Sequence, residues 1–385
     1  MSEKQKIPFR RTETHDAPQQ AQQEKATKKA KKSHRGLKVF GCIVLVLVIA
    51  YAVIALLPRP QNFEGVNPMR KAGELPILIA HGGGNREFPD NTLEGFYNAY
   101  SLDPDAMMET DVSITADGVI ILSHDVRLDR KTNVTGYIAE WNYADLIDQR
   151  VDFGYTNTVK SQVRAEETPL TKFTTDDGQN VSPVQDFMPE TLPEGVQPRD
   201  PEVFLATTLE DLILAFPESR INVEIKQEGE TGMRCLEAIL VLLEKHDAWD
   251  RVVLASFHND IYAEYQRLQK EEGKKLMCSP GLGNAALFYV MQLLNADVFF
   301  GESTTVLQLP TEYELEVAGL EMKIDLATPG LIDAAHDHNM AVHYWTINDP
   351  VEMRELIELG ADGIMTDYPH LLQQVYDEWA AEHAE

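Results

Sequence analysis

The chain has 385 residues, of which 43% are hydrophobic, so it can bury the core of one large domain or two ordinary ones. Its formal charge is −28, but the first 38 residues are basic, with eleven Lys and Arg against four Asp and Glu. The rest carries 23 basic and 58 acidic side chains, a net charge of −35. So acidic a body repels the phosphates of nucleic acids, which disfavours nucleic-acid binding, whereas clustered carboxylates can hold divalent cations.

The N-terminal region has two parts with opposite properties. Residues 1–36 are rich in Lys, Gln, Thr and Ala, which predicts a disordered tail. The following run, VFGCIVLVLVIAYAVIALL at Val39–Leu57, has 19 residues without a charge and is long enough to cross a bilayer as a helix. We assign a transmembrane helix to residues 37–57, with its basic flank and the N-terminus in the cytoplasm and the large body outside the cell membrane.

Two other interpretations of this apolar run are a cleaved signal peptide and a buried helix. A signal peptide has a shorter apolar region nearer the N-terminus and a small-x-small cleavage site, whereas this run ends in Pro58-Arg59-Pro60. Its uniform apolarity and its basic flank argue against a buried helix. Residues 58–73 have the composition of a linker outside the membrane.

From residue 74 onward, short apolar runs alternate with amphipathic stretches, which predicts strands alternating with helices and therefore a parallel sheet. The apolar runs lie at 75–80, 106–114, 221–226, 251–257, 274–280, 341–347 and 361–369. Seven or eight such units fit an α/β fold, the (β/α)8 TIM barrel, which we assign to residues 74–376. A doubly wound open sheet is the structural alternative.

Two regions of this body are less regular. No clear strand-helix unit lies between 137 and 207, and we expect an insertion over one mouth of the barrel. The sixth strand could be DVFF at 297–300 or TVLQLP at 305–310. Of the three cysteines, one lies in the apolar run, and Cys235 and Cys278 could pair or stay free.

The ends of the expected strands carry the residues with chemical potential, because catalytic groups of such barrels lie at the C-terminal ends of strands. In chain order these residues are His81, Glu109, Asp111, His124, Glu224, Lys226, Trp345 and Asp367. The pairs at 109 and 111 and at 224 and 226 are spaced i, i+2, so both members of each pair face one side of their strand.

Three of these side chains, Glu109, Asp111 and Glu224, are carboxylates directed at one barrel mouth. Oxygen ligands of this kind suit Ca²⁺ or Mg²⁺, and without a cation they would repel one another and raise their pKa values. A single inward glutamate is often part of an ion pair, and Lys226 could be the partner of Glu224. The three together at matching strand ends predict a metal site.

Two histidines, His81 and His124, could act as general base and general acid near neutral pH. For either alone, a hydrogen-bonded structural role is the alternative. Lys226 could bind a phosphate as a point charge or form an ion pair with the carboxylates. Trp345 could form a wall of the substrate pocket or pack in the core.

The ordered motifs resemble those of the glycerophosphodiester phosphodiesterases over roughly residues 77–370, apart from the insertion. They are HGG at 81–83, PDNT at 89–92, ETD at 109–111, TADG at 115–118, HD at 124–125, EIK at 224–226, WTIN at 345–348 and DGIMTDYP at 362–369.

The resemblance implies a TIM-barrel enzyme that cleaves glycerophosphodiesters to glycerol 3-phosphate and an alcohol with Ca²⁺ or Mg²⁺. By the same resemblance, the 2-hydroxyl of the substrate attacks phosphorus, and water then opens the resulting cyclic phosphate. Which histidine is the base in the first step stays open. The implied roles are metal ligation by Glu109, Asp111 and Glu224, acid and base catalysis by His81 and His124, and substrate contacts by Lys226 and Trp345.

Two positions depart from the family pattern. Most members read H-R-G at the first strand, and the arginine is expected to contact phosphate, but this chain has Gly82 there. Arg86 lies four residues on and is a candidate replacement. Members also commonly carry Glu where Asp90 stands. The first departure bears on phosphate affinity and substrate identity more than on the reaction type.

Three functions are compatible with these features. The main one is a membrane-tethered, extracytoplasmic glycerophosphodiesterase. The second is a relative directed at lysophospholipids or at a glycerophosphate wall polymer, and the third is a non-catalytic binding protein on a retained barrel. The complete set of histidines and carboxylates argues against the third. The stretch HGGG at 81–84 is not a nucleotide cradle, because it lacks both Lys-Ser/Thr after its last glycine and the G-x-G-x-x-G spacing.

Overall fold

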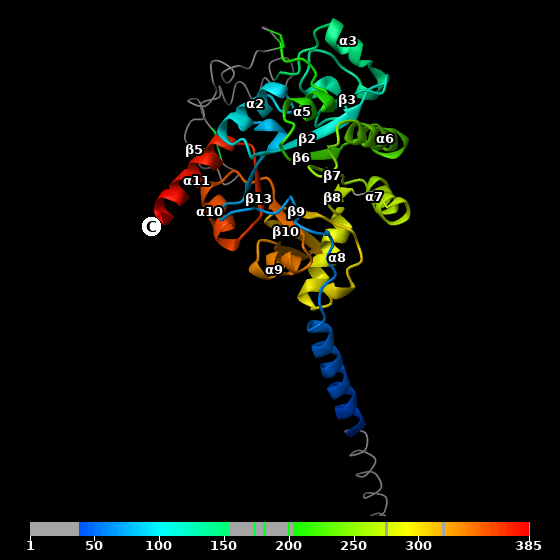
Figure 1. Ribbon diagram of the computed structural model, residues 1–385, viewed down its shortest axis with the longest axis vertical. Helices are drawn as coiled ribbons and strands as arrows, with labels where there is room; N and C mark the ends of the chain where they lie inside the picture. Colours follow the sequence, from blue (N-terminus) through cyan, green and yellow to red (C-terminus); the bar gives the residue numbers. More distant parts are fainter. Residues whose placement is uncertain are drawn as a thin grey trace, which may run out of the picture. The chain divides into compact units, whose positions relative to one another are not determined.

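The computed structural model describes residues 38–154, 173–174, 180–181, 199–200, 203–273, 276–317 and 320–384, in two compact units, Met1–Pro58 and Arg59–Glu385. In the first unit, the described residues form one helix, Lys38–Ala55 (Figure 1). Its mean hydropathy is 2.6, and most of its side chains are exposed. It is long and apolar enough to cross a membrane, a property that a signal sequence shares. The tail expected at 1–36 lies outside the described residues.

The second unit is built on a nearly closed barrel of eight parallel strands, in the order β8-β7-β6-β2-β1-β13-β12-β9 (Figure 1). The strands are β1 (Ile77–Ala80), β2 (Met107–Ile114), β6 (Ile221–Ile225), β7 (Val252–Ala255), β8 (Met277–Cys278), β9 (Val306–Leu309), β12 (Ala341–Tyr344) and β13 (Gly363–Thr366). The two end strands approach each other where the Thr305 N–H donates to the Cys278 carbonyl at 2.9 Å. This closure confirms the TIM barrel and excludes the doubly wound sheet.

Helices follow the strands and cover the outside of the barrel. They are α2 (Leu93–Leu102), α5 (Leu209–Ala215), α6 (Gly229–Lys245), α7 (Asn259–Glu272), α8 (Leu282–Leu293), α9 (Pro329–Asp337), α10 (Pro350–Leu359) and α11 (Pro369–His383). Several begin at side chains that accept hydrogen bonds from the first turn, such as Thr92 and Asp349. Thr208 and Asp211 form a complete capping box at the start of α5. These local signals fix where the chain turns from strand-end loop to helix.

Shorter elements decorate the barrel. The strand β3 (Ile120–Leu122) pairs antiparallel with β2, and a hairpin of β10 (Glu312–Val317) and β11 (Leu320–Asp325) follows β9. The remaining elements are η1 (His81–Gly83), η2 (Leu128–Arg130), η3 (Ile138–Glu140), α3 (Tyr143–Asp148), β4 (Phe173–Thr174), β5 (Asn180–Val181) and η6 (Asp297–Phe299).

Two regions that were less regular in the sequence are the sixth strand and the insertion expected at 137–207. The sixth barrel strand is β9, within TVLQLP, whereas DVFF forms η6 and the residue after it. In this insertion, η3 and α3 pack against Ile121 and Leu128 in one hydrophobic cluster. Most of the other residues of the insertion lie outside the described residues. Cys235 and Cys278 are unpaired and buried, and burial raises the pKa of each thiol to about 12.

The hydrophobic core has two shells because side chains alternate across each strand. Along β1, Leu78 packs outward against the helices, and Ile79 packs inward in the barrel interior. The inward shell also contains Met69, from the segment that precedes β1. All three side chains are fully buried.

The segment expected to be a linker, 58–73, crosses the N-terminal ends of the strands from Arg59 onward. The Asn67 side chain donates 2.8 Å hydrogen bonds to the carbonyls of Thr305 and Asn339, which precede β9 and β12. His343 Nε2 donates to the Met69 carbonyl at 2.8 Å. This segment therefore forms the floor of the barrel, and the C-terminal ends of the strands form the opposite, open mouth.

Candidate active site and metal centre

The first candidate residue, His81, lies where β1 turns directly into η1. Gly82 follows it with φ +54°, a left-handed conformation that L side chains rarely adopt, and its N–H donates to Glu109 Oε2 at 2.8 Å. A Cβ at this position would lie 3.3 Å from the Cβ of Asp90. The backbone at Gly82 is therefore part of the carboxylate site, and the turn leaves little room for a side chain there.

The three predicted carboxylates come together at the mouth. Glu109 and Asp111 project from β2, and Asp111 is paired in register with Glu224 of β6. One oxygen from each of the three side chains lies within 4.8 Å of the other two. This is a set of hard oxygen donors of the type that Ca²⁺ and Mg²⁺ prefer.

The electrostatics of the group fit a cation. Burial, together with the charge of Asp111, raises the pKa of Glu109 to about 8, although His81 and the Gly82 N–H oppose the shift. Burial also raises the pKa of Glu224, against the opposing charge of Lys226. Both shifts express the cost of holding crowded carboxylates away from water. A divalent cation would offset that cost, and the donor chemistry of these residues fits one.

Lys226 already neutralises part of this charge. Its Nζ lies 2.8 Å from Glu224 Oε1 and 3.0 Å from Asp111 Oδ1. Burial would lower the pKa of Lys226, but the two carboxylates raise it well above its ordinary value, so the side chain is protonated. The ion pair that the sequence offered as an alternative role for Lys226 is thus present.

His81 is held by Asp367, a residue that was expected at a strand end but had no predicted role. His81 Nδ1 lies 2.7 Å from Asp367 Oδ1, and its Nε2 lies 4.0 Å from Glu109 Oε2. Burial alone would lower the pKa of His81, but the hydrogen bond to Asp367 and the charge of Glu109 raise it to about 10. Asn85 and Asn348 also donate to Asp367, at 2.7 and 2.9 Å.

Asp367 accepts from His81 Nδ1, because an ionised carboxylate has no hydrogen to donate, and this bond lowers the pKa of Asp367. Burial would raise that pKa, and the hydrogen bond from His81 and the charge on His81 lower it. Nδ1 therefore carries a hydrogen, and Nε2 is the nitrogen that faces the carboxylates and can exchange a proton with a substrate.

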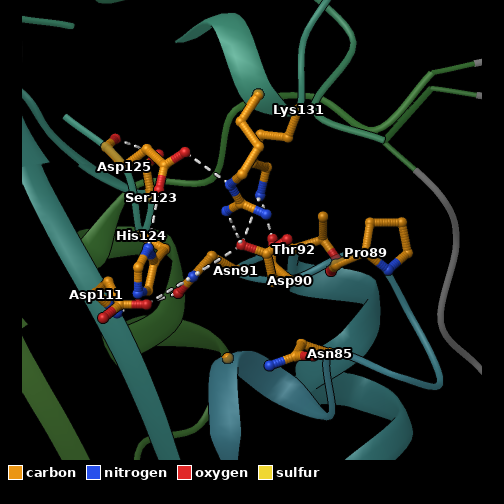
Figure 2. A network of polar contacts seen from close by, with 12 residues as sticks. Asn85, Pro89, Asp90, Asn91, Thr92, Asp111, Ser123, His124, Asp125 and Lys131 are labelled. Carbon is orange, nitrogen blue, oxygen red and sulfur yellow. Dashed lines mark hydrogen bonds and ion pairs between the residues drawn. The ribbon is translucent and has the colours of Figure 1, made fainter. Parts of the chain in front are cut away.

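The second histidine has a similar partner. His124 Nδ1 lies 2.9 Å from Asp125 Oδ1, which directs Nε2 away from Asp125 (Figure 2). Asp125 accepts from Arg130 Nε at 2.7 Å, and Arg130 reaches Asp90 at 2.9 Å. A protonated His124 would lower the pKa of Glu224, so the two side chains are close enough to interact. The two histidines thus flank the carboxylate group from different loops.

Asn91 positions one of the carboxylates. It has φ +60°, and its amide nitrogen donates to Asp111 Oδ2 at 3.0 Å, as Figure 2 shows. Its amide oxygen accepts from Thr110 Oγ1 at 2.7 Å and from the Asp111 N–H at 3.1 Å. The motif PDNT was noted in the sequence, but only the fold reveals that its asparagine is bonded to β2.

The remaining candidates lie around this centre. The Trp345 ring packs edge-to-face against Phe257 at the ends of β12 and β7, with centroids 6.1 Å apart. Arg86, the candidate replacement for the arginine missing at Gly82, has its Nε 3.8 Å from Asp367 Oδ2. Lys131 is buried beside Asp90 and donates to its carbonyl. Arg86 remains partly exposed at the mouth.

Comparisons with known proteins agree with this geometry. A model of the "Glycerophosphoryl diester phosphodiesterase family" matches residues 81–371. The chain is 25% identical over 303 residues to a "Probable glycerophosphodiester phosphodiesterase 2" of Mycobacterium tuberculosis, covering 78% of this chain and 90% of the relative. It is 23% identical over 327 residues to the "Lysophospholipase D GDPD1" of Mus musculus, covering 81% and 90%.

Solved structures show the same fold. The glycerophosphoryl diester phosphodiesterase domain of a Mycobacterium tuberculosis protein matches with a TM-score of 0.56 and 19% identity, over 78% of this chain and 98% of that one. A phosphodiesterase of Oleispira antarctica in complex with sn-glycerol 3-phosphate matches with a TM-score of 0.51 and 19% identity, over 79% and 97%. The family match extends over most of the barrel, and the chain is a phosphoric diester hydrolase that belongs to the glycerophosphoryl diester phosphodiesterase family.

Proposed function

We propose that this chain hydrolyses glycerophosphodiesters to glycerol 3-phosphate and an alcohol in a divalent-cation-dependent reaction. The observation that supports this most is the position of two histidines, each bonded through Nδ1 to an aspartate, on either side of three clustered carboxylates. A diesterase needs a proton acceptor for its nucleophile, a proton donor for its leaving group and positive charge for the phosphate, and this mouth offers all three.

The cation would be held by Glu109, Asp111 and Glu224, and it is either Ca²⁺ or Mg²⁺. When bound, it would lower the pKa of a substrate hydroxyl and offset the charge that develops on the phosphate oxygens. Lys226, between two of these carboxylates, would give its charge to the phosphate once the cation shares its partners. Trp345 would line the glycerol side of the pocket.

The histidines would move the protons. In the first step, one histidine takes the proton of the substrate 2-hydroxyl, whose oxygen attacks phosphorus. The other histidine gives a proton to the departing alcohol oxygen, and a cyclic phosphate remains. In the second step water adds to phosphorus and opens the ring, with the roles of the histidines reversed. Asp367 and Asp125 would hold the two imidazoles in position and stabilise their protonated forms.

We also propose that the chain is anchored in the cell membrane by residues 37–57, with the tail 1–36 in the cytoplasm and the catalytic domain 74–376 outside. The apolar helix Lys38–Ala55 and the basic segment before it support this topology. Protease added to intact cells should then digest the body and spare the tail.

The test of the activity uses the full chain in detergent with glycerophosphocholine, Ca²⁺ or Mg²⁺, and a matched sample with chelator. We expect glycerol 3-phosphate only when the cation is present, and none from His124→Ala, whose fold is checked by circular dichroism. The proposal fails if no diester in a panel of head groups releases glycerol 3-phosphate with either cation.

A second candidate substrate is a lysophospholipid, because an apolar surface lies beside the mouth. The hairpin β10–β11 begins close after the C-terminal end of β9 and pairs Tyr313 with Ile324 and Leu315 with Met322 on one face. Tyr313, Leu315 and Met322 each expose more than a third of their surface, enough to bind an acyl chain. A mouse relative is named a lysophospholipase D. Comparing lysophosphatidylcholine with glycerophosphocholine as substrates separates the two, and the same panel can include a glycerophosphate wall polymer.

A further inference from the structure

Helix α8 exposes an apolar face that has no charged residue. Four residues on one side of the helix, at positions that recur every three or four residues, are Leu287, Val290, Leu293 and Leu294, which are 44, 51, 59 and 61% exposed. Between residues 276 and 296 the sequence contains no Asp, Glu, Lys or Arg. The opposite side of the helix is anchored in the core by Ala285 and Phe288. The face is therefore a firmly held outer surface of the barrel.

Two other helices of the same barrel, α7 and α10, carry charged side chains on their exposed faces. On α7, Arg267 is surrounded by Glu264, Glu271 and Glu272, and on α10, Arg354 forms ion pairs with the last helix. Single exposed apolar residues are common on protein surfaces. A continuous uncharged face on a body with a net charge of −35 is instead typical of a surface that binds another molecule or a membrane.

The point at which the anchor joins the body indicates the partner. Arg59 follows the last residue of the apolar run by two positions, and its guanidinium makes bonds of 2.5 and 3.1 Å to Asp297. Asp297 comes three residues after Leu294 and begins η6, in which Phe299 is 62% exposed. Asn62 continues the attachment with a 2.8 Å bond to the Glu302 carbonyl. The part of the body joined to the anchor is thus the part that carries the apolar face.

We propose that the outer face of α8, with Phe299 of η6, lies in the headgroup and upper acyl region of the membrane in which the chain is anchored. This inference rests on the proposed membrane span. A helix with such a face binds the interface by burying apolar side chains, and the absence of acidic residues on it avoids repulsion by anionic lipids.

The orientation has a consequence for the active site. Helix α8 begins just after β8, at the mouth, and ends just before η6, on the side of the floor. A membrane along its outer face would therefore lie beside the barrel wall, with the rim of the mouth at the level of the lipid headgroups. A substrate that is itself embedded in the membrane could then reach the carboxylates without leaving the bilayer surface.

The test uses the full chain reconstituted in phosphatidylcholine–phosphatidylglycerol vesicles, with Cys42→Ser to remove the exposed thiol. Val290→Cys is labelled with the fluorophore NBD, and the matched control is Val241→Cys on α6, a valine that is 66% exposed. Doxyl-labelled lipids are the quencher. Cys235 and Cys278 are buried, and the C42S parent measures any labelling of them.

We expect emission from position 290 to shift to the blue and to be quenched by doxyl lipid about threefold more than emission from position 241, because an interfacial helix face lies within the headgroup and acyl boundary. Equal quenching at the two positions would overturn the inference. A blue shift at position 290 without lipid quenching would also overturn the inference, because it would mean that a second copy covers the face. Release of the chain from the vesicles by alkaline carbonate would overturn it as well.

Release of glycerol 3-phosphate from added glycerophosphocholine is measured on the same vesicles. The proposed activity and the proposed membrane contact can then fail separately. Lipid quenching at position 290 without any release would contradict the proposed activity and support the membrane contact. Release with equal quenching at 290 and 241 would do the reverse.

Discussion

Replacing Asp367 with asparagine tests the assignment of His81 more sharply than replacing the histidine itself. Asp367→Asn keeps the size of the side chain and removes the charge that accepts from His81 Nδ1 at 2.7 Å. Asn85 donates to Oδ1, the oxygen that also accepts from His81, whereas Asn348 donates to Oδ2. An amide oxygen in the place of Oδ1 still accepts from His81 and Asn85, but the amide nitrogen then faces the Asn348 donor. The change therefore acts on the orientation and the protonation of the imidazole and also removes the bond from Asn348.

The expected loss can be bounded from this contact. A hydrogen bond to a charged group contributes about 1.5–3 kcal/mol, and each 1.36 kcal/mol is tenfold in rate, so kcat should fall about 10- to 100-fold. His81→Ala removes the proton-transfer group itself and should cost about 10²- to 10⁴-fold. Because Asp367 is expected to act through His81, KM should stay nearly unchanged in Asp367→Asn.

The assay is steady-state release of glycerol 3-phosphate at saturating cation, with Asn85→Ala as the matched control. Asn85→Ala removes one donor to Asp367 but leaves in place the carboxylate that accepts from His81, so its loss of kcat should be smaller than that of Asp367→Asn. The reasoning is refuted if Asp367→Asn retains more than half of the wild-type kcat, or if its loss exceeds that of His81→Ala.

Three further predictions address the metal, the pH dependence of stability and the floor. Saturating Ca²⁺ or Mg²⁺ should stabilise the wild type by about 2.7 kcal/mol at 100 times Kd, and Glu224→Gln should weaken cation binding in calorimetry; equal affinity would remove Glu224 from the ligands. The pKa of the buried Asp362 is lowered: burial would raise this pKa, but the 2.7 Å bond from His336 and the bond from the Val342 N–H lower it. The contribution of Asp362 to the free energy of unfolding is therefore present above the unfolded pKa of about 3.9 and is lost as pH falls through the folded pKa. Asp362→Asn should therefore destabilise the chain in urea at pH 7 and progressively less as pH falls below about 3.9, and an effect that does not shrink on acidification would contradict this account. Met69→Ala should cost about 2–5 kcal/mol of unfolding free energy because it opens a cavity in the barrel interior, whereas Val66→Ala, at a side chain that is 92% exposed, should change nothing measurable.

Much of the barrel and of its mouth could be predicted because the relevant signals are local. The i, i+2 spacing in β2 placed Glu109 and Asp111 on one face, and the rule that chemistry lies at strand ends brought in Glu224 of β6. Their convergence within 4.8 Å agrees with that expectation. Strand and helix periodicity likewise predicted the alternating units.

What could not be predicted depends on contacts between distant segments. Arg130 joins Asp125 to Asp90 across 40 positions of sequence, and no spacing rule indicates that link. Asn91 reaches β2 because its backbone takes a left-handed turn, which the motif alone does not show. The floor segment was expected to be a linker because it has no periodic pattern, yet Met69 lies in the barrel interior.

The floor and the mouth of the barrel lie at opposite ends of its strands and serve different purposes. The helix Lys38–Ala55, which we propose as the anchor, is followed in the chain by the segment that crosses the N-terminal ends of the strands, whereas the loops that bear His81 and His124 emerge at the opposite ends. Mutations that reshape the mouth for a new head group leave Asn67 and Met69 untouched, and changes in the anchor leave the catalytic loops untouched. In the proposed topology, recognition of the head group at the mouth and attachment through the floor therefore depend on different residues of the barrel.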